Sequence, residues 1–217
     1  MVVLETNDFV NSRSGLKSWK DAAEVWMQEQ IPFIKYHNVW KCLVSDKVWD
    51  ETYYKGFQVR NAVTPYTGGD YMAQTDEVTP VSDGGSRYLE KIRTLCEENG
   101  SSLLLVSTPS PDNYNYAIHN GIEVCAGEKG VDYLDLNLLI SEIGLDWNTD
   151  ALDGGDHLNR QGGEKMSSYF GQYLAEHYRL TDHRDDEAFS DWKELAETYE
   201  ETKTTMSLDK IDDYDYE

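Results

Sequence analysis

Short apolar runs that alternate with helical patterns constrain this sequence most. Residues 103–106 read Leu-Leu-Leu-Val, and a run that is apolar throughout indicates a strand covered on both faces. It lies between residues 86–98 and 113–128, where apolar side chains recur at helical spacing, and a second strand is predicted over 131–136. Strands that alternate with helices in this way indicate a parallel sheet in an α/β domain.

Further segments extend this pattern. The apolar run at residues 2–4 is followed by Asn7 and Asp8, which predicts a buried strand over residues 2–5 that ends in a turn. Because buried strands seldom begin at the second residue of a chain, we expect an upstream segment in the natural protein. Apolar spacing also predicts helices over residues 17–29, 31–43, 161–177 and 186–203.

Residues 50–82 interrupt the regular pattern. The segment contains Pro65, Gly68, Gly69 and Pro80, so it is predicted to be a long irregular insertion. Loops of this length in a compact domain are usually functional, and this one is a candidate wall of a substrate site. Its aromatic side chains either stack on sugar rings or pack onto the core, and packing is the simpler interpretation. These aromatic residues are Tyr53, Tyr54, Phe57, Tyr66 and Tyr71.

Charge excludes several classes of partner. The 217 residues include 41 acidic and 19 basic ones, for a net charge of −22. Nucleic-acid binding and docking on anionic membranes both need clustered Lys and Arg. The sequence has no apolar run near the ~20 residues of a membrane span, and its first residues do not match a signal peptide. Much of the charge lies in a C-terminal tail, 204–217, that is expected to be solvated and disordered.

The segment from 146 to 165 carries the most chemical information. His157 stands in a loop rich in Gly and Asp, just before a predicted helix. A histidine in such a loop can act as an acid or base when a nearby carboxylate orients its ring. The alternative is a polar loop that only caps the following helix, and for an Asp-x-His pair taken alone that alternative is favoured.

A metal site in this segment is not expected. Asp146, Asn148 and Asp150 have the spacing that opens an EF-hand loop, but the sixth position is Ala151 and the twelfth is His157. A calcium loop needs Gly and Glu at those two positions. Zinc is also not expected, since the other histidines are scattered and the three cysteines are not paired in spacing. No cofactor is predicted.

The block Asp-Gly-Gly-Asp-His-Leu-Asn-x-x-Gly-x-x-Lys at residues 153–165 resembles the last signature block of SGNH (GDSL-like) hydrolases. The chain is similar to a clostridial-type subgroup of that family, which is distantly like the protein that assists D-alanylation of lipoteichoic acid. Further matches are Ile-Pro-Phe-Ile-x-Tyr-His-x-x-Trp at 31–40, Tyr-Lys-Gly at 54–56 and Leu-Leu-Val-x-Thr-Pro-x-Pro at 104–111.

The resemblance implies a three-layer, mostly parallel flavodoxin-like sheet over residues 1–185, without its first strand. It implies that His157 is the general base of a Ser-His-Asp triad. The family's Asp stands three residues before the His, where this chain has Gly154. Asp153 is therefore assigned the orienting role, with Asp156 as the alternative.

The resemblance also assigns Asn7 to the oxyanion hole, although an Asn at a strand end can equally form an Asx turn. Glu5 stands where the family has Gly. The family's nucleophilic Gly-Asp-Ser turn is absent from the sequence. Ser107 and Ser110 are its only plausible internal substitutes, and neither leads into a helix N-terminus. Either an upstream segment carries the nucleophile or the chain is inactive.

Two functions remain open at this stage. The resemblance implies a serine ester hydrolase or O-acyl transferase that acts on acyl or acetyl esters of cell-envelope or extracellular glycans, in an extracytoplasmic location. The alternative is a non-catalytic pseudo-enzyme or an acidic interaction module, because the nucleophile block is missing. A missing first strand would leave a sheet edge exposed, so self-association through that edge is also expected.

Overall fold

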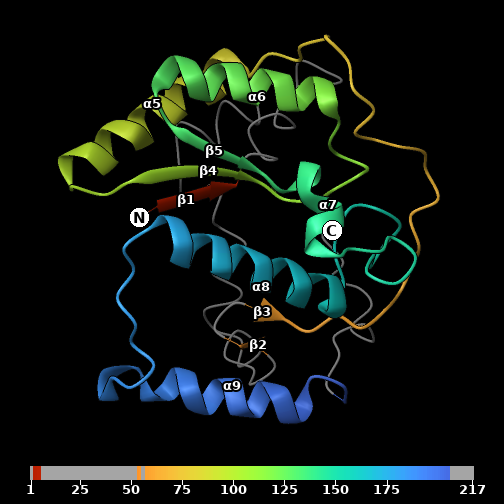
Figure 1. The fold of residues 1–217 in the computed structure, drawn as a ribbon, viewed down its shortest axis with the longest axis vertical. Coiled ribbons are helices and arrows are strands. Elements are labelled where there is room, and N and C mark those ends of the chain that lie inside the picture. The colour runs from red at the N-terminus through yellow and green to blue at the C-terminus, as the bar shows by residue number, and fades with distance from the viewer. Residues whose placement is uncertain (1, 6–52, 55–56, 206–217) are drawn as a thin grey trace, which may run out of the picture. The chain divides into compact units, whose positions relative to one another are not determined.

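The computed structural model describes residues 2–5, 53–54 and 57–205. These residues divide into two compact units (Figure 1). The first unit contains residues 2–5 and 61–180, and the second contains 53–54, 57–60 and 181–205. The helices predicted over 17–29 and 31–43, and nearly all of the predicted 204–217 tail, lie outside the described residues.

A parallel sheet of three strands forms the centre of the first unit. Its strands are β1 (Val2–Glu5), β4 (Leu103–Ser107) and β5 (Asp132–Asp135), in the order β1-β4-β5. β4 pairs in parallel with both neighbours, and Ser107 lies opposite Asp135 in the register. The three predicted strands are thus confirmed. Because the strands are parallel, all three end at the same edge of the sheet. The polar residue Asp135 is the last residue of β5 and lies at this edge.

Two helices cover one face of this sheet. They are α5 (Asp83–Glu98) and α6 (Tyr116–Lys129) (Figure 1). Leu105 of β4 packs in one buried cluster with Leu89 of α5 and Cys125 of α6. Successive side chains of a strand point to opposite faces, so the neighbours of Leu105 in β4 face away from these helices.

A third helix covers the other face. It is α8 (Arg160–His177), on the opposite side of the sheet from α6 (Figure 1). Leu104 and Val106 of β4 belong to a second buried cluster, against which Phe170 and Leu174 of α8 pack. The uniformly apolar sequence of β4 is therefore explained by helices on both faces, as its pattern predicted. The first unit is a mixed helix-and-strand structure of the α/β type.

Capping side chains determine where two helices begin. α5 begins at Asp83, earlier than the predicted residue 86, because the Ser82 side chain accepts a hydrogen bond from the Gly85 N–H. α6 begins at Tyr116, later than the predicted residue 113, because Asn115 caps it in the same way. Between β5 and α8 lie the short helices η2 (Leu136–Leu139) and α7 (Ile140–Ile143).

The second unit corrects the prediction that residues 50–82 are wholly irregular. β2 (Tyr53–Tyr54) and β3 (Phe57–Gln58) form a short antiparallel pair. The unit also contains η3 (Glu187–Phe189) and α9 (Ser190–Thr202), and the ring of Phe57 packs edge-to-face on Tyr199 of α9. No helix in the described part of the chain is both long and apolar enough to cross a membrane.

Gly121 of α6 provides a test of this packing. A Cβ at Gly121 would lie 1.8 Å from the backbone oxygen of Thr79, in a segment bonded to α6 through the Thr79 N–H and the Ala117 carbonyl. We expect Gly121→Ala to lower the free energy of unfolding by about 1–3 kcal/mol through overpacking, as measured by urea denaturation. Gly127→Ala, on the same helix with open space around it, should instead be neutral or stabilising by up to about 1 kcal/mol. Equal effects at the two positions would contradict this arrangement.

Candidate active site

The loop that carries His157, residues 144–159 (the His157 loop), lies between α7 and α8. Its C-terminal end is fixed by the buried Asn159, whose Oδ1 accepts hydrogen bonds from the Gln161 and Gly162 N–H groups at the start of α8. The Asn159 amide also donates to the Thr149 carbonyl oxygen at 2.7 Å. The expected helix-capping role of this loop is therefore real, and Asn159 performs it. His157, Asp153 and Asp156 take no part in this cap.

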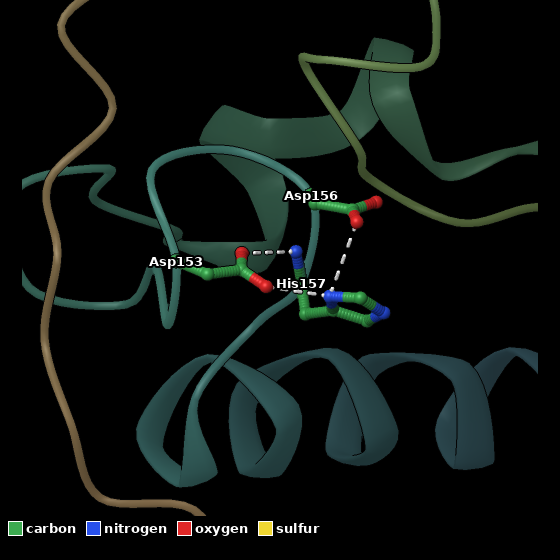
Figure 2. Close-up of side chains that lie close together, drawn as sticks. All are labelled: Asp153, Asp156 and His157. Atoms are coloured by element: carbon green, nitrogen blue, oxygen red, sulfur yellow. Dashed lines mark hydrogen bonds and ion pairs between the residues drawn. The ribbon is translucent and has the colours of Figure 1, made fainter. Parts of the chain in front are cut away.

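His157 is paired with Asp153. Its Nδ1 lies 2.7 Å from Oδ2 of Asp153, and its backbone N–H donates to Oδ1 of the same carboxylate at 2.8 Å (Figure 2). Gly154 and Gly155 adopt positive φ values of 92° and 135°, which non-glycine residues rarely do. These two glycines let the chain turn back so that a carboxylate four residues before the His reaches its ring.

Asp156 is the more distant carboxylate. Its Oδ2 lies 3.5 Å from Nδ1 of His157, and its Oδ1 accepts a hydrogen bond from the side-chain amide of Asn113.

Partial burial by itself would raise the pKa of Asp153, but the hydrogen bonds donated by His157 outweigh it and hold that pKa below its usual range. The geometry thus favours Asp153 as the residue that orients the ring.

The remaining ring nitrogen is available for chemistry. Nε2 of His157 points away from both carboxylates (Figure 2), and 65% of the side chain is exposed. A carboxylate at Nδ1 favours the tautomer in which Nε2 is unprotonated and stabilises the imidazolium that forms when Nε2 takes a proton. The pair can therefore act as a general base towards a group that approaches from solvent.

The same three side chains have the composition of a metal site. Asp153, Asp156 and His157 each offer one ligand atom, and these atoms lie within 4.8 Å of one another. All three are exposed, however, and both carboxylates already accept hydrogen bonds from neighbouring groups. The direct hydrogen bond between the ring and Asp153 occupies the position that a shared metal ion would take, so the arrangement fits an Asp–His pair better.

The two strand-end serines are both buried. Ser107 is fully buried at the end of β4, where its Oγ lies 2.9 Å from the Tyr133 hydroxyl and accepts from the Tyr114 hydroxyl at 3.2 Å. Ser110 is 4% exposed and donates its hydroxyl hydrogen to the Asp156 backbone oxygen. The Ser110 side chain therefore supports the His157 loop by bonding to the backbone of that loop. Neither serine is presented to solvent as a nucleophile would be.

Asp135 forms a buried polar centre that the sequence did not reveal. It stands at the end of β5, and its Oδ2 accepts from the Tyr114 hydroxyl at 2.8 Å and lies 2.8 Å from Nδ1 of His119. Its Oδ1 accepts two hydrogen bonds from Asn137, each 2.8 Å long. The Asp at the end of a predicted strand was the only signal, because its partners come from other elements.

A pocket of about 320 Å³ also lies in the first unit. The aromatic rings of Tyr66, Tyr71 and Trp147 line it, and Asn137 contributes from η2. Tyr66 also touches the His157 loop, since a Cβ on Gly155 would lie 2.8 Å from its ring. The two tyrosines were singled out in the sequence, whereas Trp147 and Asn137 carried no recognisable signal.

The other expected site residues have these positions. Asn7 lies outside the described residues, and β1, which precedes it, ends at Glu5 beside Val106. Lys165 pairs with the fully buried Asp150 at 2.6 Å. Lys165 therefore pairs with a nearby acid.

Comparison with known proteins adds no further assignment. No protein-family model matches the sequence, and neither the curated proteins nor the solved structures yielded a match.

The buried His119–Asp135 pair should make stability depend on pH. The hydrogen bond to Asp135 raises the pKa of His119 above its usual value despite the opposing effect of burial. Its contribution to the free energy of unfolding is then complete below the ordinary histidine pKa of about 6.5. It is lost as the pH rises through the raised pKa of the folded state.

We therefore expect His119→Asn, which keeps a donor but not a charge, to cost about 1 kcal/mol more at pH 5.5 than at pH 8.5. Urea denaturation of both proteins at the two pH values measures this difference. A cost that is the same at both values would show that His119 does not gain a proton on folding.

Proposed function

We propose that the chain is an SGNH-type serine ester hydrolase or O-acyl transferase, with His157 as general base and Asp153 as the residue that orients it. The observation that carries the proposal is the 2.7 Å contact between Nδ1 of His157 and Oδ2 of Asp153, which leaves Nε2 directed away from both carboxylates. This is the base half of a Ser-His-Asp triad. It also fits the sequence resemblance at residues 153–165.

In this mechanism, Nε2 of His157 takes the proton of a serine hydroxyl as that oxygen attacks the carbonyl carbon of an ester. Asp153 keeps the ring in place and stabilises its positive charge. The same proton then passes from Nε2 to the leaving alcohol, and an acyl-enzyme remains. Water or a second alcohol releases the acyl group, which gives hydrolysis or transfer respectively. The substrate class, acyl or acetyl esters of glycans, comes from the resemblance.

The fold proposed for this activity is a three-layer, flavodoxin-like domain. A parallel sheet with α5 and α6 on one face and α8 on the other supports it. In open α/β sheets, ligands bind beyond the carboxyl ends of the strands. Ser110, which follows β4, bonds to the backbone of Asp156, so the His157 loop is attached at that edge.

Neither serine that the sequence offered as the nucleophile is placed to act as one. Ser107 and Ser110 are buried and engaged in hydrogen bonds, so the proposal requires another serine. The same observation favours a second candidate, a non-catalytic pseudo-enzyme or acidic interaction module. The two candidates differ in whether the protein forms a covalent adduct with a serine-directed reagent.

Fluorophosphonate labelling followed by peptide mapping, together with hydrolysis of p-nitrophenyl acetate, tests the proposal. We expect one labelled serine. We also expect His157→Ala to slow both labelling and hydrolysis by about 10²-fold or more, because general base catalysis contributes about that much. Asp153→Asn should reduce both rates substantially, since it removes the carboxylate that orients the ring.

Asp156→Asn is the matched control, because Asp156 is also exposed and close to the ring but makes the longer contact. Its rates should stay within about twofold of the wild-type values. A wild-type protein with no adduct and no turnover would contradict the hydrolase and favour the non-catalytic module. Labelling that His157→Ala leaves unchanged would exclude His157 as the base.

A further inference from the structure

The pocket beside the His157 loop is built mainly from three aromatic rings. Each pair of rings is close to perpendicular: Tyr66 and Tyr71 at 84°, Tyr71 and Trp147 at 79°, and Tyr66 and Trp147 at 69°. The ring centroids lie 6.2, 6.0 and 6.2 Å apart in the same order. All three rings line the same pocket, and each stands at a steep angle to the other two.

This spacing suits a cation. In an ideal box of three perpendicular rings, a cation about 4.3 Å from the centre of each face would place the centroids about 6.1 Å apart, and attraction to a ring face extends to about 6 Å. The measured separations of 6.0–6.2 Å match that geometry. The pocket volume of about 320 Å³ is at the small end of the range for ligand sites.

Local bonds hold the three rings in position. The backbone N–H of Tyr66 donates to the Trp147 carbonyl oxygen at 3.2 Å and joins the two loops. The Tyr71 hydroxyl donates to Oδ1 of Asn137 at 3.1 Å, and the Tyr66 hydroxyl donates to the Gly69 carbonyl oxygen at 3.3 Å. Rings held in this way lose little freedom when a ligand binds.

The Asn137 side chain of the pocket is already fully hydrogen-bonded, so it cannot hold a sugar ligand. Asn137 donates both amide hydrogens, to the Thr108 carbonyl oxygen and to Asp135, and its Oδ1 accepts from Tyr71 and from the Ser110 N–H. An amide has no further hydrogen-bonding capacity than this. A sugar ring needs several polar partners at once, whereas a quaternary ammonium group needs none.

The charge around the pocket also favours a cation. The pocket is lined by Tyr66, Gly68, Gly69, Asp70, Tyr71, Met72, Asn137, Ile140 and Trp147. Among these described residues, the one charged side chain is the acidic Asp70. Burial raises the pKa of Tyr71, and the carboxylates of Asp135 and Asp70 raise it further. The net charge of the whole chain, −22, has the same sign.

We propose that Tyr66, Tyr71 and Trp147 form an aromatic cage that binds a quaternary ammonium group, with Asp70 supplying the opposite charge. Cation–π attraction to three faces replaces the hydration of a cation whose methyl groups cannot donate hydrogen bonds. This site is distinct from the Asp153–His157 pair. Its occupation is measured by binding alone, so it does not rest on the ester chemistry proposed above.

Isothermal titration with choline chloride and with its neutral isostere, 3,3-dimethylbutan-1-ol, tests the proposal on the intact chain. The two probes have the same shape, so an apolar pocket would bind both alike, whereas a cage selects the charged one. We expect choline to bind at least tenfold more tightly than the isostere. Equal affinity for the two probes, or binding of a neutral methyl glycoside in preference to choline, would overturn the proposal.

Variants locate the site. We expect Trp147→Ala to weaken choline binding at least tenfold, Trp147→Phe to keep most of it, and Asp70→Asn to weaken it several-fold. Trp192→Ala is the matched control, because Trp192 is a half-exposed tryptophan of α9 that does not line the pocket. Choline affinity that survives Trp147→Ala, or that falls equally in Trp192→Ala, would overturn the assignment. His157→Ala should bind choline as the wild type does.

Discussion

A buried carboxylate at the end of β5 supports both candidate sites in the described part of the chain. Asp135 is 6% exposed, and a carboxylate buried to this degree is tolerated only when hydrogen bonds replace its lost hydration. Those bonds come from Tyr114 before α6, from His119 within α6 and from Asn137 in η2. Hydrogen bonds to this one carboxylate therefore hold together the segments that follow β4 and β5 at that edge of the sheet.

Asn137 connects Asp135 to both candidate sites. Its Oδ1 accepts from the Tyr71 hydroxyl, which positions one ring of the aromatic cage. The same oxygen accepts from the Ser110 N–H, and the Ser110 hydroxyl bonds to the backbone of Asp156 beside the catalytic candidate His157. The cage and the His157 loop thus share a support although their side chains perform different chemistry. A change in Asp135 would therefore disturb both.

Local sequence signals predicted the strands and the longer helices of the first unit but not the contacts among them. The strands at 2–5 and 103–106 and the helix at 161–177 were correct because apolar periodicity records which faces are buried. The role of Asn137 could not be predicted, since its partner Tyr71 lies 66 residues away. The contact of His157 with Asp153 was assigned through the resemblance. It depends on positive φ values at two glycines that the sequence permits but does not require.

Exposure determines what the Asp153–His157 pair can do. The His157 side chain is 65% exposed, and water weakens any interaction between this ring and a carboxylate. The Asp153 carboxylate nevertheless holds the ring through two short hydrogen bonds, one to Nδ1 and one to the backbone N–H, so its contribution is orientation more than charge. Ester chemistry also needs a nucleophile and donors for the oxyanion, acting where water is excluded. An exposed, well-oriented base meets only part of that need, because the described residues around His157 supply its orientation but leave most of the ring in water.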